Sequence, residues 1–215
     1  IEHQGKIIIN LWGGYQDKEK TKLWEEDTLV NVFSVTKGVT ATCISRLIDQ
    51  GKLDPSKSVG NYWPEYACNG KENTKVSDLL CHRAAMFGFK DGIPSGSFQD
   101  WKKFTKQLQM QVPYRKPGIS QGYHALTFGW LAGELIRRVD GRTVGTYFKE
   151  EIADPLNIDF HIGLAESEFV RCADMLMLPM ENIKLPGEFL KFLPNFFLPQ
   201  KLQNFKAALL SGDFM

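Results

Sequence analysis

Cysteine is scarce in this chain, and net charge is almost absent. The four cysteines among 215 residues are widely spaced and form no Cys-x-x-Cys pair: Cys43, Cys68, Cys81 and Cys172. Metal and redox motifs are therefore unsupported, and buried free thiols are the favoured interpretation. The formal net charge of +1 gives no reason to expect binding to nucleic acid or to an anionic membrane surface.

Long apolar runs and targeting segments are also lacking. No stretch has the length of a transmembrane helix, and no signal or transit peptide is recognisable. This absence is weak evidence, because the chain begins at Ile1 rather than Met, and we expect a fragment or a shortened protein. Thiols without a disulfide pattern lean slightly towards an intracellular location, and the compartment stays open.

What is present is the composition of an ordinary globular protein, with 43% hydrophobic and 24% charged residues. Because helical patterns alternate with short strand-like runs, we predict one mixed domain over residues 1–215, with a helical portion at about 55–185. Apolar periodicity predicts the helices, and β-branched runs predict the strands. The expected helices lie near 39–50, 76–80, 98–110, 126–139 and 144–152, and the expected extended segments at 6–12 and 28–33.

The most informative stretch surrounds Ser34, at the entry to the first predicted helix. Lys37 follows three residues later and therefore lies one turn on, along the same helix face. A serine hydroxyl needs a neighbour that takes its proton, and a lysine in apolar surroundings can do so because burial favours the neutral amine. The first-turn N–H groups would face a developing oxyanion. Ser-x-x-Lys at a helix start thus suits an acyl-transfer nucleophile.

Simpler interpretations exist for this motif and for the aromatic tail. Ser34 could be an N-cap and Lys37 a solvated first-turn residue, because a Ser-x-x-Lys match also arises by chance. The stretch 188–198 is rich in Phe and Leu and is best interpreted as core or interdomain packing. A lid over an acyl-binding cleft and a membrane-associating helix are the alternatives for this stretch.

Several segments occur in an order that resembles one family. Phe33-Ser34-Val35-Thr36-Lys37 is followed by Leu53-Asp54-Pro55, Leu79-Leu80-Cys81-His82, Pro117-Gly118 and then Tyr123. This combination is similar to the β-lactamase-related serine hydrolases: class C β-lactamases, penicillin-binding proteins and β-lactamase-fold carboxylesterases. The resemblance implies an α+β fold of the β-lactamase/transpeptidase type, with an antiparallel sheet flanked by helices and a helical subdomain.

The resemblance also implies roles for three residues. Ser34 would be acylated, Lys37 would help to deprotonate it, and Tyr123 would supply a second proton-transfer group. A phenol has an unperturbed pKa of about 10, so Tyr123 acts as a base only if a positive neighbour such as Lys37 stabilises the phenolate. An ordinary aromatic packed at a helix start is the alternative for Tyr123.

The tyrosine box departs from the family pattern. Its third position is Ala125 rather than Asn, so no side-chain amide is there to hold a lysine or a substrate amide. This weakens the case for β-lactam or peptide hydrolysis and favours ester hydrolysis. His124 is assigned a packing or hydrogen-bonding role, and His82 is expected to shape the turn near the site rather than to bind metal.

The family's third box is missing from the sequence. No Lys-Thr-Gly or Lys-Ser-Gly occurs, and His161-Ile162-Gly163 has the letters of a variant but follows Pro155-Leu156-Asn157, well upstream of the expected strand. We interpret it as a false match. The closing C-terminal strands, and with them the second oxyanion-hole donor, are not found in residues 1–215.

The resulting hypothesis is a serine hydrolase, more esterase-like than β-lactamase-like, acting on a small-molecule ester or amide. Neither a metal nor an organic cofactor is implied, since side chains supply the nucleophile and the bases. The alternative is a catalytically impaired scaffold or binding protein that keeps the fold without the third box. Substrate identity and oligomeric state stay open.

Overall fold

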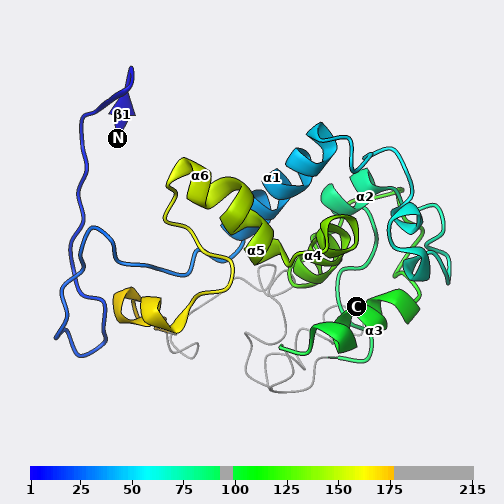
Figure 1. Cartoon of the computed structure of the whole chain (residues 1–215). Coiled ribbons are helices and arrows are strands. Elements are labelled where there is room, and N and C mark those ends of the chain that lie inside the picture. Colours follow the sequence, from blue (N-terminus) through cyan, green and yellow to red (C-terminus); the bar gives the residue numbers. More distant parts are fainter. Residues whose placement is uncertain (93–98, 177–215) are drawn as a thin grey trace. The chain divides into compact units, whose positions relative to one another are not determined.

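The computed structural model describes residues 1–92 and 99–176, which form two compact units (Figure 1). The first unit contains residues 1–31 and the chain from Glu166 onward, and the second contains residues 32–165. The aromatic stretch 188–198 lies outside the described residues. The single domain over residues 1–215, with its helical portion at about 55–185, stays a prediction.

In the described residues of the first unit, the chain forms one hairpin and one short helix. Strands β1 (Glu2–His3) and β2 (Lys6–Ile7) pair antiparallel, with Glu2 opposite Ile7. Gln4 and Gly5 both have positive φ, of 50° and 72°, which is the geometry of a tight two-residue hairpin turn. The strand expected at 6–12 ends at Ile7, because the described part of the chain offers no partner strand that continues the ladder.

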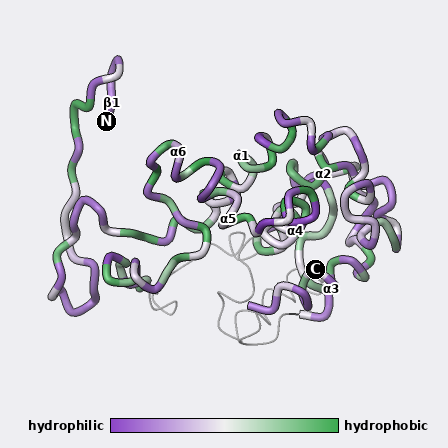
Figure 2. Tube along the Cα trace, viewed as in Figure 1, coloured by the Kyte–Doolittle hydropathy of each residue, from purple (hydrophilic) through white to green (hydrophobic). Residues whose placement is uncertain are grey.

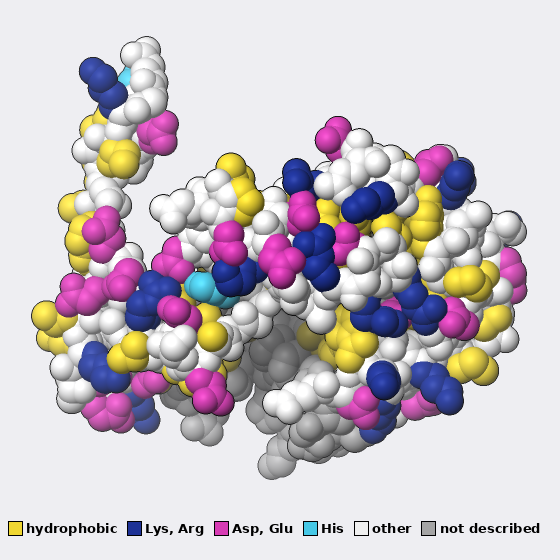
Figure 3. Space-filling model, viewed as in Figure 1, with side chains coloured by type: hydrophobic (Ala, Val, Ile, Leu, Met, Phe, Trp, Pro, Cys, Tyr) yellow, Lys and Arg dark blue, Asp and Glu magenta, His cyan; other side chains and the backbone are white. Residues whose placement is uncertain are grey.

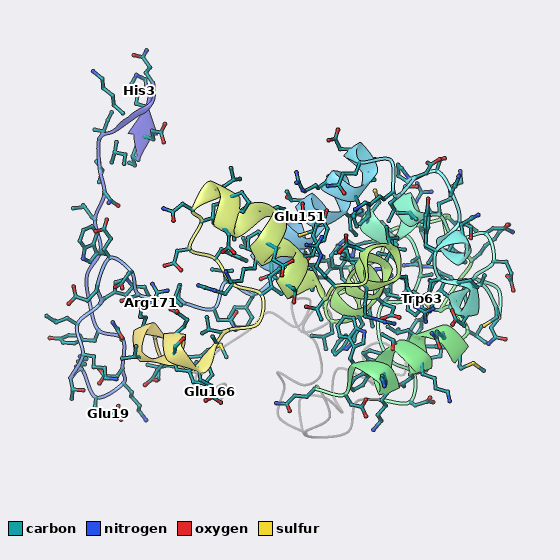
Figure 4. The ribbon with its side chains drawn as sticks, viewed as in Figure 1. His3, Glu19, Trp63, Glu151, Glu166 and Arg171 are labelled. Atoms are coloured by element: carbon teal, nitrogen blue, oxygen red, sulfur yellow. The ribbon has the colours of Figure 1, made fainter. Side chains whose placement is uncertain are left out.

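The segment expected to be extended at 28–33 forms one β-bridge in the described residues. Leu29 forms an isolated parallel bridge with Cys172, directly after the 3₁₀ helix η4 (Glu166–Arg171). Arg171, labelled in Figure 4, donates from Nη1 to the Asp27 carbonyl at 3.0 Å. The β-branched and apolar residues of 28–33 also predict burial, which is wrong for Phe33, because this side chain is 56% exposed.

The second unit is built from helices. These are α1 (Val35–Asp49), η1 (Val59–Asn61), η2 (Pro64–Tyr66), α2 (Val76–Leu80), α3 (Trp101–Met110), α4 (Thr127–Asp140), α5 (Val144–Phe148), the π-helical turn η3 (Lys149–Ala153) and α6 (Asp154–Leu156). The helices predicted from apolar periodicity are confirmed at α1, α2, α3, α4 and α5. Within residues 1–92 and 99–176, no helix combines the length and apolar character needed to cross a membrane.

Helices α1 and α4 pack against each other at the centre of this unit. Cys43, Ile44 and Leu47 of α1 are fully buried, as their helical spacing predicted. A buried Ile or Leu side chain stabilises the fold by about 1.5–3 kcal/mol. Helix α4, which contains both hydrophobic and hydrophilic residues (Figure 2), buries Phe128, Leu131 and Leu135 in this core. Gly141, in a left-handed conformation with φ 93°, ends α4.

Charged side chains tie the helices together around this core. Glu134 of α4 is buried and accepts a hydrogen bond from the Trp101 indole of α3 at 2.8 Å. On the surface, Glu151 of η3, labelled in Figure 4, accepts from Arg46 of α1 at 2.7 Å. Figure 3 shows Lys and Arg interspersed with Asp and Glu over the visible face. The contact between Arg46 and Glu151 links η3 to α1, whose first turn carries the candidate site.

Candidate active site

Ser34 stands at the N-cap position of α1 but does not cap the helix with its side chain. The preceding residue, Phe33, has a left-handed φ of 46°, a conformation that costs a non-glycine residue about 1–2 kcal/mol. The chain therefore turns sharply into the helix at Ser34. The interpretation of Ser34 as an ordinary capping serine is wrong, because its hydroxyl makes other contacts.

Lys37 lies one helical turn beyond Ser34, as the spacing predicted. Its Nζ donates to Ser34 Oγ at 3.1 Å and to the backbone carbonyl of Ala125 at 2.8 Å. Ala125 is 88 residues away in the chain, so this ammonium joins α1 to the segment that precedes α4. Lys37 is thus held in place and is not a freely solvated first-turn side chain.

Tyr123 reaches the same serine from the segment before α4. Its Oη donates to Ser34 Oγ at 2.7 Å, and Lys37 Nζ lies 5.0 Å from the centre of its ring. Burial acts to raise the pKa of Tyr123, but hydrogen bonds with Ser34 and Lys37 and the positive charge of Lys37 outweigh it, so the pKa is lowered. The structure brings together the three side chains that the sequence singled out.

A turn at residues 82–86 holds the segment that carries Tyr123. The N–H of Gly122 donates to the His82 carbonyl at 2.9 Å, and the N–H of His124 donates to His82 Nδ1 at 3.1 Å. The N–H of Met86 donates to His124 Nε2 at 3.0 Å. His82 itself has a left-handed φ of 59°. As expected, His82 shapes a turn beside the site, and His124 is buried and hydrogen-bonded.

The carbonyl of Ala125 is a feature that sequence reasoning missed. Loss of the family's asparagine suggested that nothing at this position would hold a lysine, yet the backbone oxygen accepts from Lys37 Nζ. Every residue has such an oxygen, so no side-chain signal could have revealed this contact. The meeting of the His82 and His124 rings was also missed, because a separation of 42 residues carries no periodic signal.

Metal binding and a third box are the other kinds of chemistry that the sequence raised. Within the described parts of the chain, no group of three or more His, Cys, Asp or Glu side chains could hold a metal ion. His161, dismissed as a false third box, has its Nε2 at 2.9 Å from Asp159 Oδ1. The arrangement at Ser34 consists of a hydroxyl, an amine and a phenol.

Comparison with known proteins shows which proteins this chain is similar to. A family model described as Beta-lactamase matches residues 1–193. Esterase/beta-lactamase LipL of Mycobacterium tuberculosis is 38% identical over 175 residues, which cover 80% of this chain and 40% of that protein.

Solved structures agree in fold. A penicillin-binding protein homologue from Caulobacter crescentus matches with a TM-score of 0.75 and 41% identity, covering 78% of this chain and 45% of that one. A family VIII carboxylesterase matches with a TM-score of 0.74 and 40% identity, covering 77% and 46%. The α+β fold class expected from the sequence is confirmed by these structures. The chain spans less than half the length of each of these three proteins.

Proposed function

Because this chain belongs to the β-lactamase family, we propose that it is a serine hydrolase that cleaves ester or amide bonds through an acyl-enzyme on Ser34, with esters preferred. The observation that carries the proposal is the convergence of Lys37 Nζ and Tyr123 Oη on Ser34 Oγ, at 3.1 and 2.7 Å. These distances lie within the reach required of a nucleophile and its base.

In the proposed first step, Ser34 Oγ attacks the substrate carbonyl. The Ser34 proton passes to Tyr123, whose lowered pKa favours a phenolate stabilised by the Lys37 ammonium. Lys37 also donates to Ser34 Oγ, so it keeps the hydroxyl oriented towards the phenol. The Ser34 backbone N–H, at the positive end of α1, would donate to the oxyanion of the tetrahedral intermediate.

Collapse of that intermediate completes acylation. The bond from carbonyl carbon to leaving group breaks, and Tyr123 returns the proton to the departing oxygen or nitrogen. In the second half, Tyr123 takes a proton from water, the hydroxide attacks the acyl carbon, and Ser34 leaves with the proton restored. Tyr123 therefore acts as base and then as acid in each half-reaction.

The preference for esters rests on Ala125. In place of an asparagine side chain, this position offers a methyl group, and its backbone oxygen is already bonded to Lys37. A site that has no side-chain amide to pair with a substrate amide gains little from binding one. Esters need less of this recognition. Relatives named as an esterase/beta-lactamase and as a carboxylesterase support an esterase-like activity.

A fluorophosphonate probe and a chromogenic short-chain ester test the proposal. We expect the unmodified protein to label and to turn over the ester, and Ser34→Ala to do neither. Ser45→Ala provides the matched control, because Ser45 lies on the same helix and bonds only the Ala41 carbonyl through its hydroxyl. Labelling that persists in Ser34→Ala would remove Ser34 from the mechanism.

The second candidate is a scaffold or binding protein with an impaired site. This alternative applies if the active site has no Lys-Thr-Gly box and therefore lacks the second oxyanion donor. Loss of one oxyanion donor costs about 10²–10³ in turnover. In that case, Ser34 would react slowly with the fluorophosphonate, and the ester would not be turned over. The hydrolase would react readily with the probe and would turn over the ester.

A further inference from the structure

The imidazole rings of His82 and His124 contact each other next to Tyr123. His82 and His124 lie with their Nδ1 atoms 3.3 Å apart, and the centre of the His82 ring is 4.9 Å from that of Tyr123. His124 is fully buried. The proposed reaction does not use either ring, so their role needs another explanation.

The hydrogen bonds around the pair determine where its protons are. Met86 donates its N–H to His124 Nε2, so that nitrogen carries a lone pair and the His124 proton lies on Nδ1, directed at His82. His82 Nδ1 accepts from the backbone N–H of His124, which leaves the His82 proton on Nε2. Protonating either ring would place a hydrogen where a donor already points. Only the neutral pair is compatible with these bonds.

The charges around the pair also favour neutrality. Lys37 faces it from α1, Tyr123 from its own segment, and the Phe128 ring of α4 packs against His82 at 5.2 Å. Burial and the neighbouring His82 lower the pKa of His124 to about 4. Burial and the charge of Lys37 lower the pKa of His82. Both rings are uncharged at neutral pH, and the cation facing Tyr123 in the described structure is Lys37.

His82 anchors Tyr123 from both sides. The N–H of Gly122, one residue before the tyrosine, donates to the His82 carbonyl, and the N–H of His124, one residue after, donates to the His82 ring. From this geometry we infer that His82 and His124 are positioning residues, whose neutral pair holds the Tyr123 hydroxyl against Ser34. This inference rests on the proposed function, since it assigns a support to the base of that reaction.

Two substitutions at His82 distinguish the effect of its hydrogen bond to the Tyr123 segment from the effect of its side-chain volume. In His82→Asn, the side-chain oxygen can accept from the His124 N–H as Nδ1 does, and asparagine tolerates the left-handed backbone found there. His82→Leu fills space but accepts no hydrogen bond. We therefore expect His82→Asn to behave like the unmodified protein and His82→Leu to release Tyr123 from Ser34.

The first measurement follows Tyr123 without relying on activity. The ultraviolet difference titration between each protein and its Tyr123→Phe derivative isolates the ionisation of this phenol. In His82→Leu, we expect the Tyr123 pKa to rise towards the ordinary phenol value, because Lys37 and Ser34 no longer hold the phenolate. In His82→Asn, it stays lowered. An unchanged Tyr123 titration in a folded His82→Leu protein would overturn the positioning role.

The second measurement is the rate of fluorophosphonate labelling. A displacement of about 1 Å can slow such a reaction by about 10²-fold, and we expect a loss of that order in His82→Leu but not in His82→Asn. If the unmodified protein does not label, while Tyr123 still titrates as described, the proposed function fails and the positioning role stands. If the unmodified protein labels normally, but Tyr123 titrates in His82→Leu as it does in the unmodified protein, the proposed function stands and the positioning role fails.

A third measurement needs no variant and covers the case in which His82→Leu does not fold. Nitrogen-15 NMR of the histidine rings reports the tautomer of each one at pH 7. We expect His124 to carry its proton on Nδ1 and His82 on Nε2, both uncharged. A charged ring at pH 7, or a His124 proton on Nε2, would overturn the inference.

Discussion

Two regions of the molecule deliver their groups to Ser34 by different physical means. The first turn of α1 places Lys37 beside Ser34 through helical geometry, since residues three apart lie on one face, and the Ala125 carbonyl then holds its ammonium. The segment 122–126 has no regular structure and is placed by hydrogen bonds to residues about forty positions earlier. One region is determined locally, and the other depends on the fold around it.

This difference predicts how each region fails. A change to Lys37 removes a chemical group but leaves the helix intact, because α1 is stabilised by Cys43, Ile44 and Leu47 in the core. A change in the support of Tyr123 leaves every reacting group present and moves one of them. Chemistry and geometry can therefore be separated by choosing the region that is altered.

Replacing the lysine should give the largest effect. In Lys37→Met, Ser34 loses a hydrogen-bond donor and Tyr123 loses the charge that lowers its pKa, so both base strength and orientation suffer. We expect fluorophosphonate labelling to slow by about 10⁴-fold, with the thermal midpoint unchanged. Lys57→Met, on an exposed loop, should label normally. Retention of most of the activity in Lys37→Met would contradict the assigned role.

Removing the Tyr123 hydroxyl should give the second largest effect. Tyr123→Phe keeps the ring but deletes the hydroxyl that lies 2.7 Å from Ser34 Oγ. We expect ester turnover to fall by about 10²–10³-fold, mostly in kcat, because proton transfer is lost. Tyr114→Phe is the matched control, since that ring stacks on Phe87. Equal losses in both variants would show that the effect is not specific to the site.

Acid should destabilise the segment 122–126 before it destabilises α1. The pKa of His124 is lowered from 6.5 to about 4, so between these values the unfolded chain binds more protons than the folded one. The free energy of unfolding therefore falls as pH falls through this window, by about 3 kcal/mol for this residue alone. Denaturant titrations at pH 7 and pH 4 measure this loss.

Matched variants identify the residue responsible. His124→Gln can still accept from the Met86 N–H through its side-chain oxygen but does not titrate, so its stability should depend less on pH. His3→Gln, in the exposed hairpin of the first unit, should keep the pH dependence of the unmodified protein. Identical pH profiles for His124→Gln and the unmodified protein would exclude His124 as the source.

A methyl group added beside Tyr123 should give the smallest effect. In Gly122→Ala, the new Cβ would meet the Phe87 ring and lie 2.8 Å from the Arg115 guanidinium, so the segment must shift. We expect a loss of about 1–3 kcal/mol in stability, together with slower labelling. Gly129→Ala in α4, where nothing lies within 4 Å, should instead stabilise the protein by about 0.5–1 kcal/mol without affecting labelling. Similar outcomes for the two variants would show that the segment tolerates displacement.

The helices were predictable because their signals are local. Apolar residues repeating every three or four positions predicted α1 and α4, and a glycine directly after the repeating pattern, Gly141, ends α4. The strand expected at 6–12 reached only Ile7, since a strand forms only where a partner supplies the other half of its hydrogen bonds. Local propensity alone could not say where that partner ends.

By itself, the chain's order of residues determined the pairing of Ser34 with Lys37, because a single helical turn joins them. It also singled out Tyr123 through resemblance, without saying what holds it. Only the tertiary structure decided that the Ala125 carbonyl binds Lys37 and that His82 bonds the residues on both sides of Tyr123. The physical reason is that such contacts join backbone and ring atoms across dozens of residues, and no spacing along the chain encodes them.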